Sequence, residues 1–278
     1  KPCHWQNGSR ECGEMKSSIG NILGRTALLR VLVSSNLKRQ NKNTALGYLW
    51  WLLDPILMTA VYYVLVAVLF KRGDGIQPYL LFVLCGLLSW KAFSDSLSQS
   101  ILSIRSQAAI IKSIGFPKAV LPLGLVLSNT VYFMAALLVA AALGAWYGPT
   151  YGTWPNLWYL VLPVVIGVQI LFTIGVVLVM ATLGVFFQDT ANISGHLVRM
   201  WFFLSPGLYS VDIVPERFQT LFRLNPFCGW MTAYRDIIMY ARMPAWQDLL
   251  YPLAAGIVSL VCGYAIFRRY EGRLVQKL

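Results

Sequence analysis

Charged residues are scarce in this sequence. Asp, Glu, Lys and Arg make up 12% of its 278 residues, whereas a soluble domain carries about a quarter. Hydrophobic residues account for 57%, and the mean hydropathy is +0.60. The shortage of charge excludes an ordinary soluble domain and favours an integral membrane protein.

Groups that could perform chemistry are equally few. The sequence has 11 acidic residues and 2 histidines, and Asp54, Asp189 and His196 each stand apart from other candidates. A membrane enzyme such as a polyprenyl-phosphate sugar transferase usually needs acidic metal ligands or a general base at the membrane face. The sequence therefore disfavours an enzyme, and we expect no catalytic residue, no metal site and no cofactor in this chain.

The five cysteines, at positions 3, 12, 85, 228 and 262, form no disulfide framework. Cys3, His4 and Cys12 lack a fourth ligand and the usual spacing of a zinc site. They lie in residues 1–16, which are polar and have no apolar core, so this segment does not predict a signal peptide. We expect a flexible tail, or a non-native one that precedes a natural start at Met15.

Long apolar runs fill most of the remaining sequence. A helix needs about 20 mainly apolar residues to cross a bilayer, and we find six runs, at about 55–70, 78–98, 119–147, 157–187, 197–211 and 249–267. We therefore predict an all-α membrane domain over 47–278, with about six transmembrane helices and both chain ends on one side. The fifth run is the shortest because Ser205, Pro206 and Gly207 break it: proline lacks an amide donor, and glycine lacks backbone restraint.

Basic residues are unevenly distributed along the loops. If the chain ends and the loops 99–118 and 188–200 face the cytoplasm, that side holds 16 of the 23 Lys and Arg against four acids. The opposite loops hold six bases against five acids. This is the positive-inside pattern, and it predicts cytoplasmic termini. Because the bases lie at membrane borders, we expect contacts with anionic membrane lipids and no binding of nucleic acid.

Two basic segments predict amphipathic helices at the cytoplasmic face. Residues 17–46 are too polar to cross, and their apolar positions recur near helical spacing, which predicts an interfacial helix. The loop 99–118 is also amphipathic and basic, and it contains no acid. It fits either a helix on the lipid surface or a docking surface for another protein, and the residues alone do not separate these roles.

The segment between the fifth and sixth runs is too long for a simple turn. Apolar residues in 222–239 recur at roughly helical spacing, and Asn225-Pro226 is a typical helix start, with Asn as the cap. The arginines, tyrosines and Asp236 of this segment predict an amphipathic helix on the outer leaflet. Re-entrant backbone is allowed at membrane depth only where it is buried in protein or lines a wet cavity. We therefore predict gate helices over 205–236 that cover an outer mouth.

Six stretches, in order and in register, resemble one family: the membrane permeases of ATP-binding-cassette (ABC) exporters that move lipid-linked polysaccharides, namely O-antigen, wall teichoic acid and capsule. They are LGYLWWLLDP (46–55), GLLSWKAFSDSL (86–97), IIKSIGFPKAVLPL (110–123), LGVFFQD (183–189), WFFLSPGLYS (201–210) and PERFQTLFRLNPFCGWMTAYRD (215–236). The resemblance covers the chain from about residue 17 onward.

The resemblance implies a half-transporter in the bacterial cytoplasmic (inner) membrane. Two copies would form the pore, and two ABC ATPase subunits would dock below it and bring ATP and Mg. The substrate would be a glycan linked to undecaprenyl pyrophosphate. The loop 99–118 becomes the ATPase-coupling element, with the candidate residues Arg105, Ser106, Gln107, Ile110, Ile111, Lys112, Phe116 and Lys118. The outer gate would include Ser205, Pro206, Gly207, Asn225, Pro226, Tyr234 and Arg235.

Other residues are candidates to contact the substrate. Aromatic rings suit the apolar faces of pyranoses, so the translocation-path candidates are Tyr62, Tyr63, Trp201, Phe202, Phe203 and Tyr209, with packing inside the subunit as the alternative for each. Arg39 and Arg199 are candidates to bind the lipid pyrophosphate, and the alternative for Arg199 is to snorkel to the interface. Lys91 and Asp95 are spaced to pair on one helix face.

Two other kinds of transporter must be weighed. A permease of the same superfamily for a capsular polysaccharide, or for a small lipid or drug, would share the fold. The long outer segment and the abundant aromatic residues argue against the small substrate. A channel or secondary transporter would need buried charge or internal repeats, and neither is evident in the sequence. The sequence also shows no nucleotide-binding loop, so ATP energy would arrive through a partner.

Overall fold

A computed structural model describes residues 28–39, 46–69, 76–108 and 118–277, and every regular element in these ranges is a helix. In chain order the elements after residue 46 are η1 (Gly47–Leu49), α2 (Trp50–Tyr63), η2 (Val64–Leu69), α3 (Tyr79–Ser103), η3 (Arg105–Gln107), α5 (Val120–Tyr151), η4 (Leu157–Val161), α6 (Leu162–Phe186), α7 (Thr190–Phe203), η5 (Val211–Ile213), α8 (Glu216–Arg223), α9 (Pro226–Ile238) and α10 (Gln247–Lys277). Residues 28–39 are also helical.

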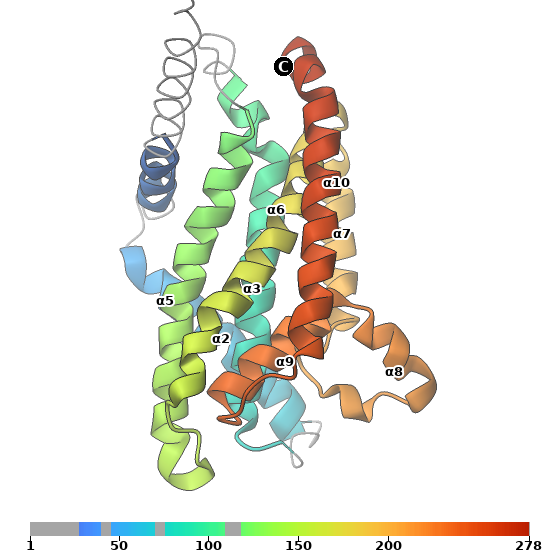
Figure 1. The fold of residues 1–278 in the computed structure, drawn as a ribbon. Coiled ribbons are helices and arrows are strands. Elements are labelled where there is room, and N and C mark those ends of the chain that lie inside the picture. Colours follow the sequence, from blue (N-terminus) through green and yellow to red (C-terminus); the bar gives the residue numbers. More distant parts are fainter. Residues whose placement is uncertain (1–27, 40–45, 70–75, 109–117, 278) are drawn as a thin grey trace, which may run out of the picture.

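Four helices are long and apolar enough to cross a membrane. They are Tyr79–Ser103, Val120–Tyr151, Leu157–Phe186 and Gln247–Leu274. These match four of the predicted runs and confirm an all-α membrane protein. In Figure 1, α3, α5, α6 and α10 run along the length of one bundle, where α6 packs against both α3 and α10. The first predicted run corresponds to a shorter apolar helix, Leu53–Leu69.

The fifth predicted run is wrong in its bounds. Helix α7 begins at Thr190 and ends at Phe203, so a helix occupies residues that we expected to form a cytoplasmic loop. A tight turn after α6 permits this early start, because Thr190 Oγ1 donates to Phe187 O at 2.9 Å. With 14 residues, α7 is about 21 Å long, which is short of the roughly 30 Å hydrocarbon core. It stops before 205–207, as the sequence predicts.

Helix α9 lies in the centre of the core. Trp230 and Tyr234 are completely buried, and the charged Arg235 and Asp236 are only 4% and 3% exposed. The helix packs against α3, α6 and α10, and in Figure 1 it lies at the lower end of the bundle while α8 projects to the side. The prediction of one amphipathic helix over 222–239 on the outer leaflet is therefore wrong. Its polar residues are buried because α3, α6 and the neighbouring turns supply partners for them.

Helices α6 and α10 approach each other closely. A Cβ atom on Gly175 would fall against the backbone of Ser259, and one on Gly263 would fall against the backbone of Gly175. Small residues at a helix crossing let the two backbones approach and gain van der Waals contact. This crossing holds α10 to the bundle although only 17% of its apolar window is buried.

The helix at residues 28–39 packs beside the first half of α5. The hydroxyl of Tyr132 donates to Leu37 O at 3.4 Å, and Leu32 packs against a buried cluster that includes Leu121. These residues are the described part of the predicted interfacial helix 17–46. Its position relative to a membrane stays a prediction.

Candidate functional site

The turn that follows α7 is bound to the first turn of α9. Asn225 Nδ2 donates to Ser205 Oγ at 2.8 Å and to Leu204 O at 3.3 Å. Asn225 Oδ1 accepts from Trp201 Nε1 and from the backbone amide of Phe227, each at 3.2 Å. Asn225 is thus the N-cap of α9, with proline at the first helical position, which confirms the predicted helix start.

Arg235 binds the same turn from the middle of α9. Its Nη2 donates to Gly207 O at 2.8 Å, its Nε donates to Phe82 O at 3.3 Å, and its Cζ lies 3.5 Å from the centroid of the Phe82 ring. The neighbouring Asp236 pairs instead with Arg242, at 2.6 Å. The Arg235 guanidinium is therefore stabilised by carbonyl dipoles and an aromatic face. We call the set Trp201, Ser205, Gly207, Asn225 and Arg235 the α7–α9 junction.

Gly86 on α3 packs directly against this junction. A Cβ atom at this position would lie 2.5 Å from Gly207 O and 2.7 Å from Arg235 Nη2. Only a glycine lets α3 approach the turn and the guanidinium this closely. The structure thus brings together most of the predicted outer-gate residues, and it adds Gly86 and Phe82, which sequence reasoning missed because nothing local marks them.

Tyr234, the remaining outer-gate candidate, points away from the junction. Its hydroxyl donates to Gln169 Oε1 at 2.9 Å, and Gln169 Nε2 donates to Ser89 O at 2.8 Å. This chain of bonds ties α9 to α6 and α3. Sequence reasoning missed Gln169, although a single amide inside the apolar run 157–187 is a signal, because a buried amide needs a partner.

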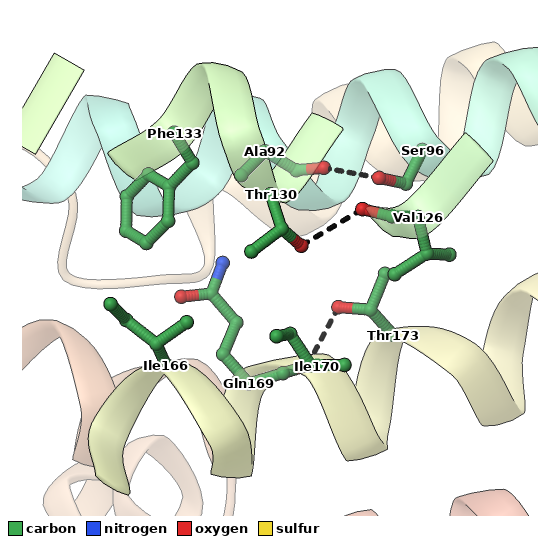
Figure 2. A pocket seen from close by; sticks show the side chains of 9 residues that line it. All are labelled: Ala92, Ser96, Val126, Thr130, Phe133, Ile166, Gln169, Ile170 and Thr173. Atoms are coloured by element: carbon green, nitrogen blue, oxygen red, sulfur yellow. Dashed lines mark hydrogen bonds between the residues drawn. The ribbon is translucent and has the colours of Figure 1, made fainter. Parts of the chain in front are cut away.

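A small cavity lies beside Gln169, between α3, α5 and α6. Its volume is about 10 Å³, which is close to the smallest space that holds one water. Figure 2 shows the Gln169 amide at its centre, next to Thr130 and Phe133. The hydroxyls of Thr130 and Thr173 donate to carbonyls one turn earlier in their own helices, at 2.8 and 2.7 Å.

An aromatic cluster surrounds the buried side of the junction. The rings of Trp90, Phe93, Phe172, Trp201 and Phe227 lie with centroids 4.7 to 6.4 Å apart. Edge and tilted contacts of this kind contribute about 0.5–1.5 kcal/mol each beyond area burial. They make this part of the subunit rigid.

The structure sorts the six aromatic path candidates into two groups. Trp201 belongs to the cluster, Phe202 is 7% exposed, and Tyr62 packs on Phe202 with centroids 6.1 Å apart. Tyr209 is half-buried, and its hydroxyl donates to Phe203 O at 2.9 Å. Only Tyr63 and Phe203 are well exposed, at 38% and 62%. Packing inside the subunit, the alternative role, therefore explains why aromatic residues occupy positions 201 and 202.

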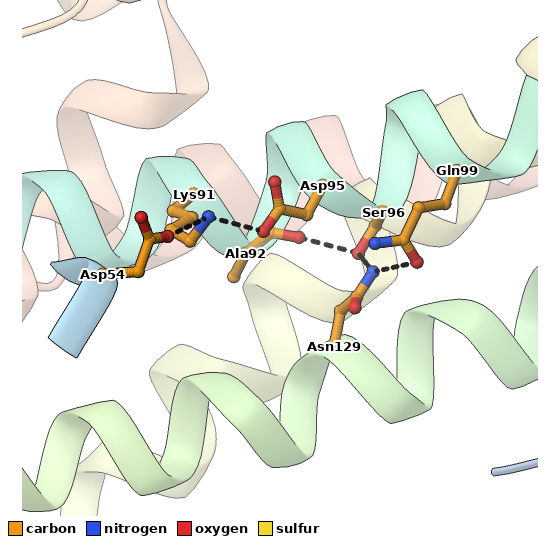
Figure 3. A network of polar contacts seen from close by, with 7 residues as sticks. All are labelled: Asp54, Lys91, Ala92, Asp95, Ser96, Gln99 and Asn129. Atoms are coloured by element: carbon orange, nitrogen blue, oxygen red, sulfur yellow. Dashed lines mark hydrogen bonds and ion pairs between the residues drawn. The ribbon is translucent and has the colours of Figure 1, made fainter. Parts of the chain in front are cut away.

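A charged network connects α2 and α3. Lys91 Nζ lies 3.0 Å from Asp95 Oδ2, which confirms the predicted pair, and 2.8 Å from Asp54 Oδ2. All three side chains are about 40% exposed. Figure 3 shows a second set of polar contacts beside it, in which Nδ2 of Asn129 on α5 donates to Ser96 Oγ at 3.2 Å. Asp54 was missed because its pairing depends on how α2 packs against α3.

The coupling candidates that the structure describes lie at the opposite end of the bundle. Arg105 Nη2 donates to Val185 O in the last turn of α6 at 2.8 Å, and Lys118 Nζ donates to Glu271 O at 2.7 Å. Both cations therefore also stabilise the fold. Ser106 is exposed and Gln107 is partly exposed. The other coupling candidates, Ile110, Ile111, Lys112 and Phe116, lie outside the described residues.

The two pyrophosphate candidates occupy separate places. Arg199 is exposed on α7, and its Nε donates to Gly195 O at 3.1 Å. Arg39 lines a cavity of about 390 Å³ between residues 28–39, α3 and α5. Its polar lining is Asn36, Arg39, Gln99, Ser103, Ser106 and Gln107, and its apolar lining is Leu32, Leu102, Leu121 and Leu125.

Comparison with known proteins identifies the family. The family described as ABC-2 type transporter matches residues 27–239. The O-antigen export system permease protein RfbA of Klebsiella pneumoniae is 30% identical over 267 residues, which cover 95% of this chain and 99% of that protein. The protein of the same name from Myxococcus xanthus is 33% identical over 249 residues, which cover 88% and 93%.

A more distant similarity points the same way. The polysialic acid transport protein KpsM of Escherichia coli is 21% identical over 229 residues, which cover 81% of this chain and 86% of that protein. The family match itself extends over well more than half of the chain, and the helical membrane bundle agrees with it. The chain therefore belongs to the ABC-2 type transporter family of membrane proteins.

Proposed function

We propose that this chain is the membrane-spanning subunit of an ATP-driven exporter for polysaccharide linked to undecaprenyl pyrophosphate. The cargo would be of the O-antigen or teichoic acid type, and it would cross the bacterial cytoplasmic membrane. Family membership and near full-length similarity to a permease named for O-antigen export support this proposal. In this proposal the chain hydrolyses no ATP, because two ABC ATPase subunits bind ATP and Mg and supply the energy.

The observation that carries the proposal is the helix break after α7. Helix α7 is too short to cross the hydrocarbon core, and the backbone after it, at 204–210, is not helical. Phe203 and Leu204 are 62% and 58% exposed there. Re-entrant backbone is allowed at membrane depth only where it is buried in protein or lines a wet cavity. The carbonyls of Leu204 and Gly207 are bonded within the subunit, so the exposed side chains of Phe203 and Leu204 mark the face that would line such a cavity. In the proposed homodimer, a second copy of the chain is apposed to α7 and α2, and the two copies enclose a water-filled pathway.

Within this pathway the described residues have separate roles. Tyr63 and Phe203 would offer exposed rings to the sugar faces, and the rigid aromatic cluster would support them. Arg199, one turn before Phe203 on α7, would meet the anionic end of the lipid carrier. The α7–α9 junction would form the outer gate, because it joins the helix break to the buried helix α9.

Energy would enter at the opposite end of the bundle. The segment 99–118 is basic and amphipathic, and the positive-inside pattern supports a cytoplasmic position for it and for both chain ends. Arg105 and Lys118 bind carbonyls of α6 and α10, so a push on this segment would reach both helices directly. These contacts support the coupling assignment.

The test uses the chain with its partner ATPase, purified together and reconstituted in vesicles. We expect deletion of 106–114 to abolish both ATPase docking and stimulation of ATP hydrolysis. A matched pair refines the result: Lys112→Glu should weaken docking, whereas Arg217→Glu, a charge reversal at the other end of the bundle, should not. Docking that survives the deletion would contradict the coupling assignment.

The cargo is tested in cells that are depleted of the protein. Lipid-linked polymer should accumulate on the cytoplasmic side, whereas export of a small lipid or drug would leave polymer unaffected. The similarity to KpsM favours a capsular polysaccharide as the second candidate. The sugar composition of the accumulated polymer separates the two.

A further inference from the structure

The 390 Å³ cavity beside Arg39 lies outside the proposed pathway. Its described lining comes from residues 28–39, the end of α3 with η3, and the first turns of α5. Neither α2 nor α7, which carry the path candidates, contributes to its lining. Its volume falls in the range of about 300–1,000 Å³ that is typical of sites for small molecules.

The charge of the lining selects an anion. Among the described residues of the lining, Arg39 is the only charged one, and none is a carboxylate. Among the described residues no ion pair involves Arg39. Asn36 and Gln107 add neutral amide donors beside it. A guanidinium with amide donors matches the oxygens of a phosphate group, because the planar fork donates two parallel hydrogen bonds.

The apolar residues of the described lining are four leucines. Leu32 comes from the 28–39 helix, Leu102 from the end of α3, and Leu121 and Leu125 from the first turns of α5. A ligand that matched both the polar and the apolar lining residues would carry a phosphate and a hydrocarbon chain. Burying hydrocarbon against such leucines contributes about 25 cal/mol per Å² of apolar surface.

We propose that this cavity binds the phosphate headgroup and the first carbons of a membrane amphiphile. Arg39 pairs with the phosphate, Asn36 and Gln107 donate to its oxygens, and the leucines hold the chain. Two sources share this chemistry: the polyprenyl pyrophosphate end of the exported glycan and an anionic phospholipid. That the ligand comes from the cytoplasmic leaflet rests on the proposed function.

The position of the site gives it a consequence for coupling. Ser106 and Gln107 lie in the lining and also begin the segment 106–114 that we assign to ATPase docking. A bound amphiphile therefore touches the 28–39 helix and η3 at once. Occupancy should fix η3 in one position relative to α5, and so it should alter ATP hydrolysis by the docked partner.

The test measures binding to the full purified chain in nanodiscs of phosphatidylcholine. The probes are farnesyl pyrophosphate, phosphatidylglycerol and inorganic pyrophosphate, and native mass spectrometry or a thermal shift reports binding. We expect Arg39→Gln to weaken binding of the amphiphiles by about tenfold or more. Arg30, like Arg39, is exposed on this helix, but it lies outside the lining, so Arg30→Gln should change binding less than about twofold. Leu125→Trp, which keeps the charge and fills the cavity, should also weaken binding.

The outcomes separate the possible sources. Tighter binding of farnesyl pyrophosphate identifies the glycan carrier, and tighter binding of phosphatidylglycerol identifies a resident phospholipid; both support the site. Binding of inorganic pyrophosphate as tightly as the amphiphiles would overturn the proposal, as would equal losses in Arg39→Gln and Arg30→Gln. Because this measurement needs neither ATPase nor transport, its failure would leave the tests of the proposed function unaffected.

Discussion

Replacing Gly86 by alanine should separate α3 from the turn after α7. The new Cβ atom would lie 2.5 Å from Gly207 O, whereas ordinary contact begins at 3.4 Å, so the turn must retreat by about 0.9 Å, the difference between these distances. Arg235 Nη2, at 2.7 Å from the same position, must also move. The 2.8 Å hydrogen bond between Arg235 and Gly207 would be lost or badly weakened.

The cost follows from this geometry. A hydrogen bond to a charged group contributes about 1.5–3 kcal/mol, and overpacking a tight contact costs about 1–3 kcal/mol. The higher helix propensity of alanine stabilises the folded state by about 1 kcal/mol relative to glycine, which offsets part of this loss. We expect a net loss of roughly 2–4 kcal/mol in the free energy of unfolding, with a lower Tm.

The assay compares thermal unfolding of the purified variants by tryptophan fluorescence, together with polysaccharide at the cell surface. Gly167→Ala on α6 is the control, because nothing lies within 4 Å of its Cβ position and the change in helix propensity is the same. A double variant with Arg235→Met should lose less than the sum of the two single changes, because both act on one contact. Equal Tm values for Gly86→Ala and Gly167→Ala would refute the reasoning.

Three further changes test other parts of the structure. Gly175→Ala should lower the Tm more than Gly167→Ala does, because its Cβ meets the backbone of Ser259 on α10; equal Tm values would show that the crossing is not tight. Tyr234→Phe removes a buried hydrogen bond to the Gln169 amide and should cost about 1–3 kcal/mol, measured by thermal unfolding. Lys91→Met leaves two carboxylates unbalanced, so it should reduce export of polysaccharide more than the charge-balanced double change of Lys91→Met with Asp95→Asn, as measured at the cell surface.

Local signals in the sequence predict the elements well. Four apolar runs correspond to membrane-spanning helices, and α7 ends before the Ser205-Pro206-Gly207 break. The Asn225 cap and the Lys91–Asp95 pair are confirmed as well. Each of these depends on residues within a few positions of one another, where spacing alone sets the geometry.

The location of α9 could not be predicted in the same way. Its tyrosine, arginine and aspartate suggest a helix at a polar surface, because burying such groups without partners is costly. Here the partners are Gln169, Gly207 and Arg242. Two of these lie far away in the sequence, and only the packed bundle brings them to α9. The start of α7 at Thr190 was missed because a polar helix resembles a loop by composition.

The Arg235 guanidinium is anchored by two amide carbonyls and a ring instead of a carboxylate. None of these anchors titrates, and arginine stays protonated in proteins. A change of pH around neutrality should therefore not loosen this contact, and buried charges of this kind are only weakly screened by salt. If the junction is the outer gate, as we propose, a cell in changing surroundings would keep it shut whatever the external pH and salt, until force transmitted along the helices moves it.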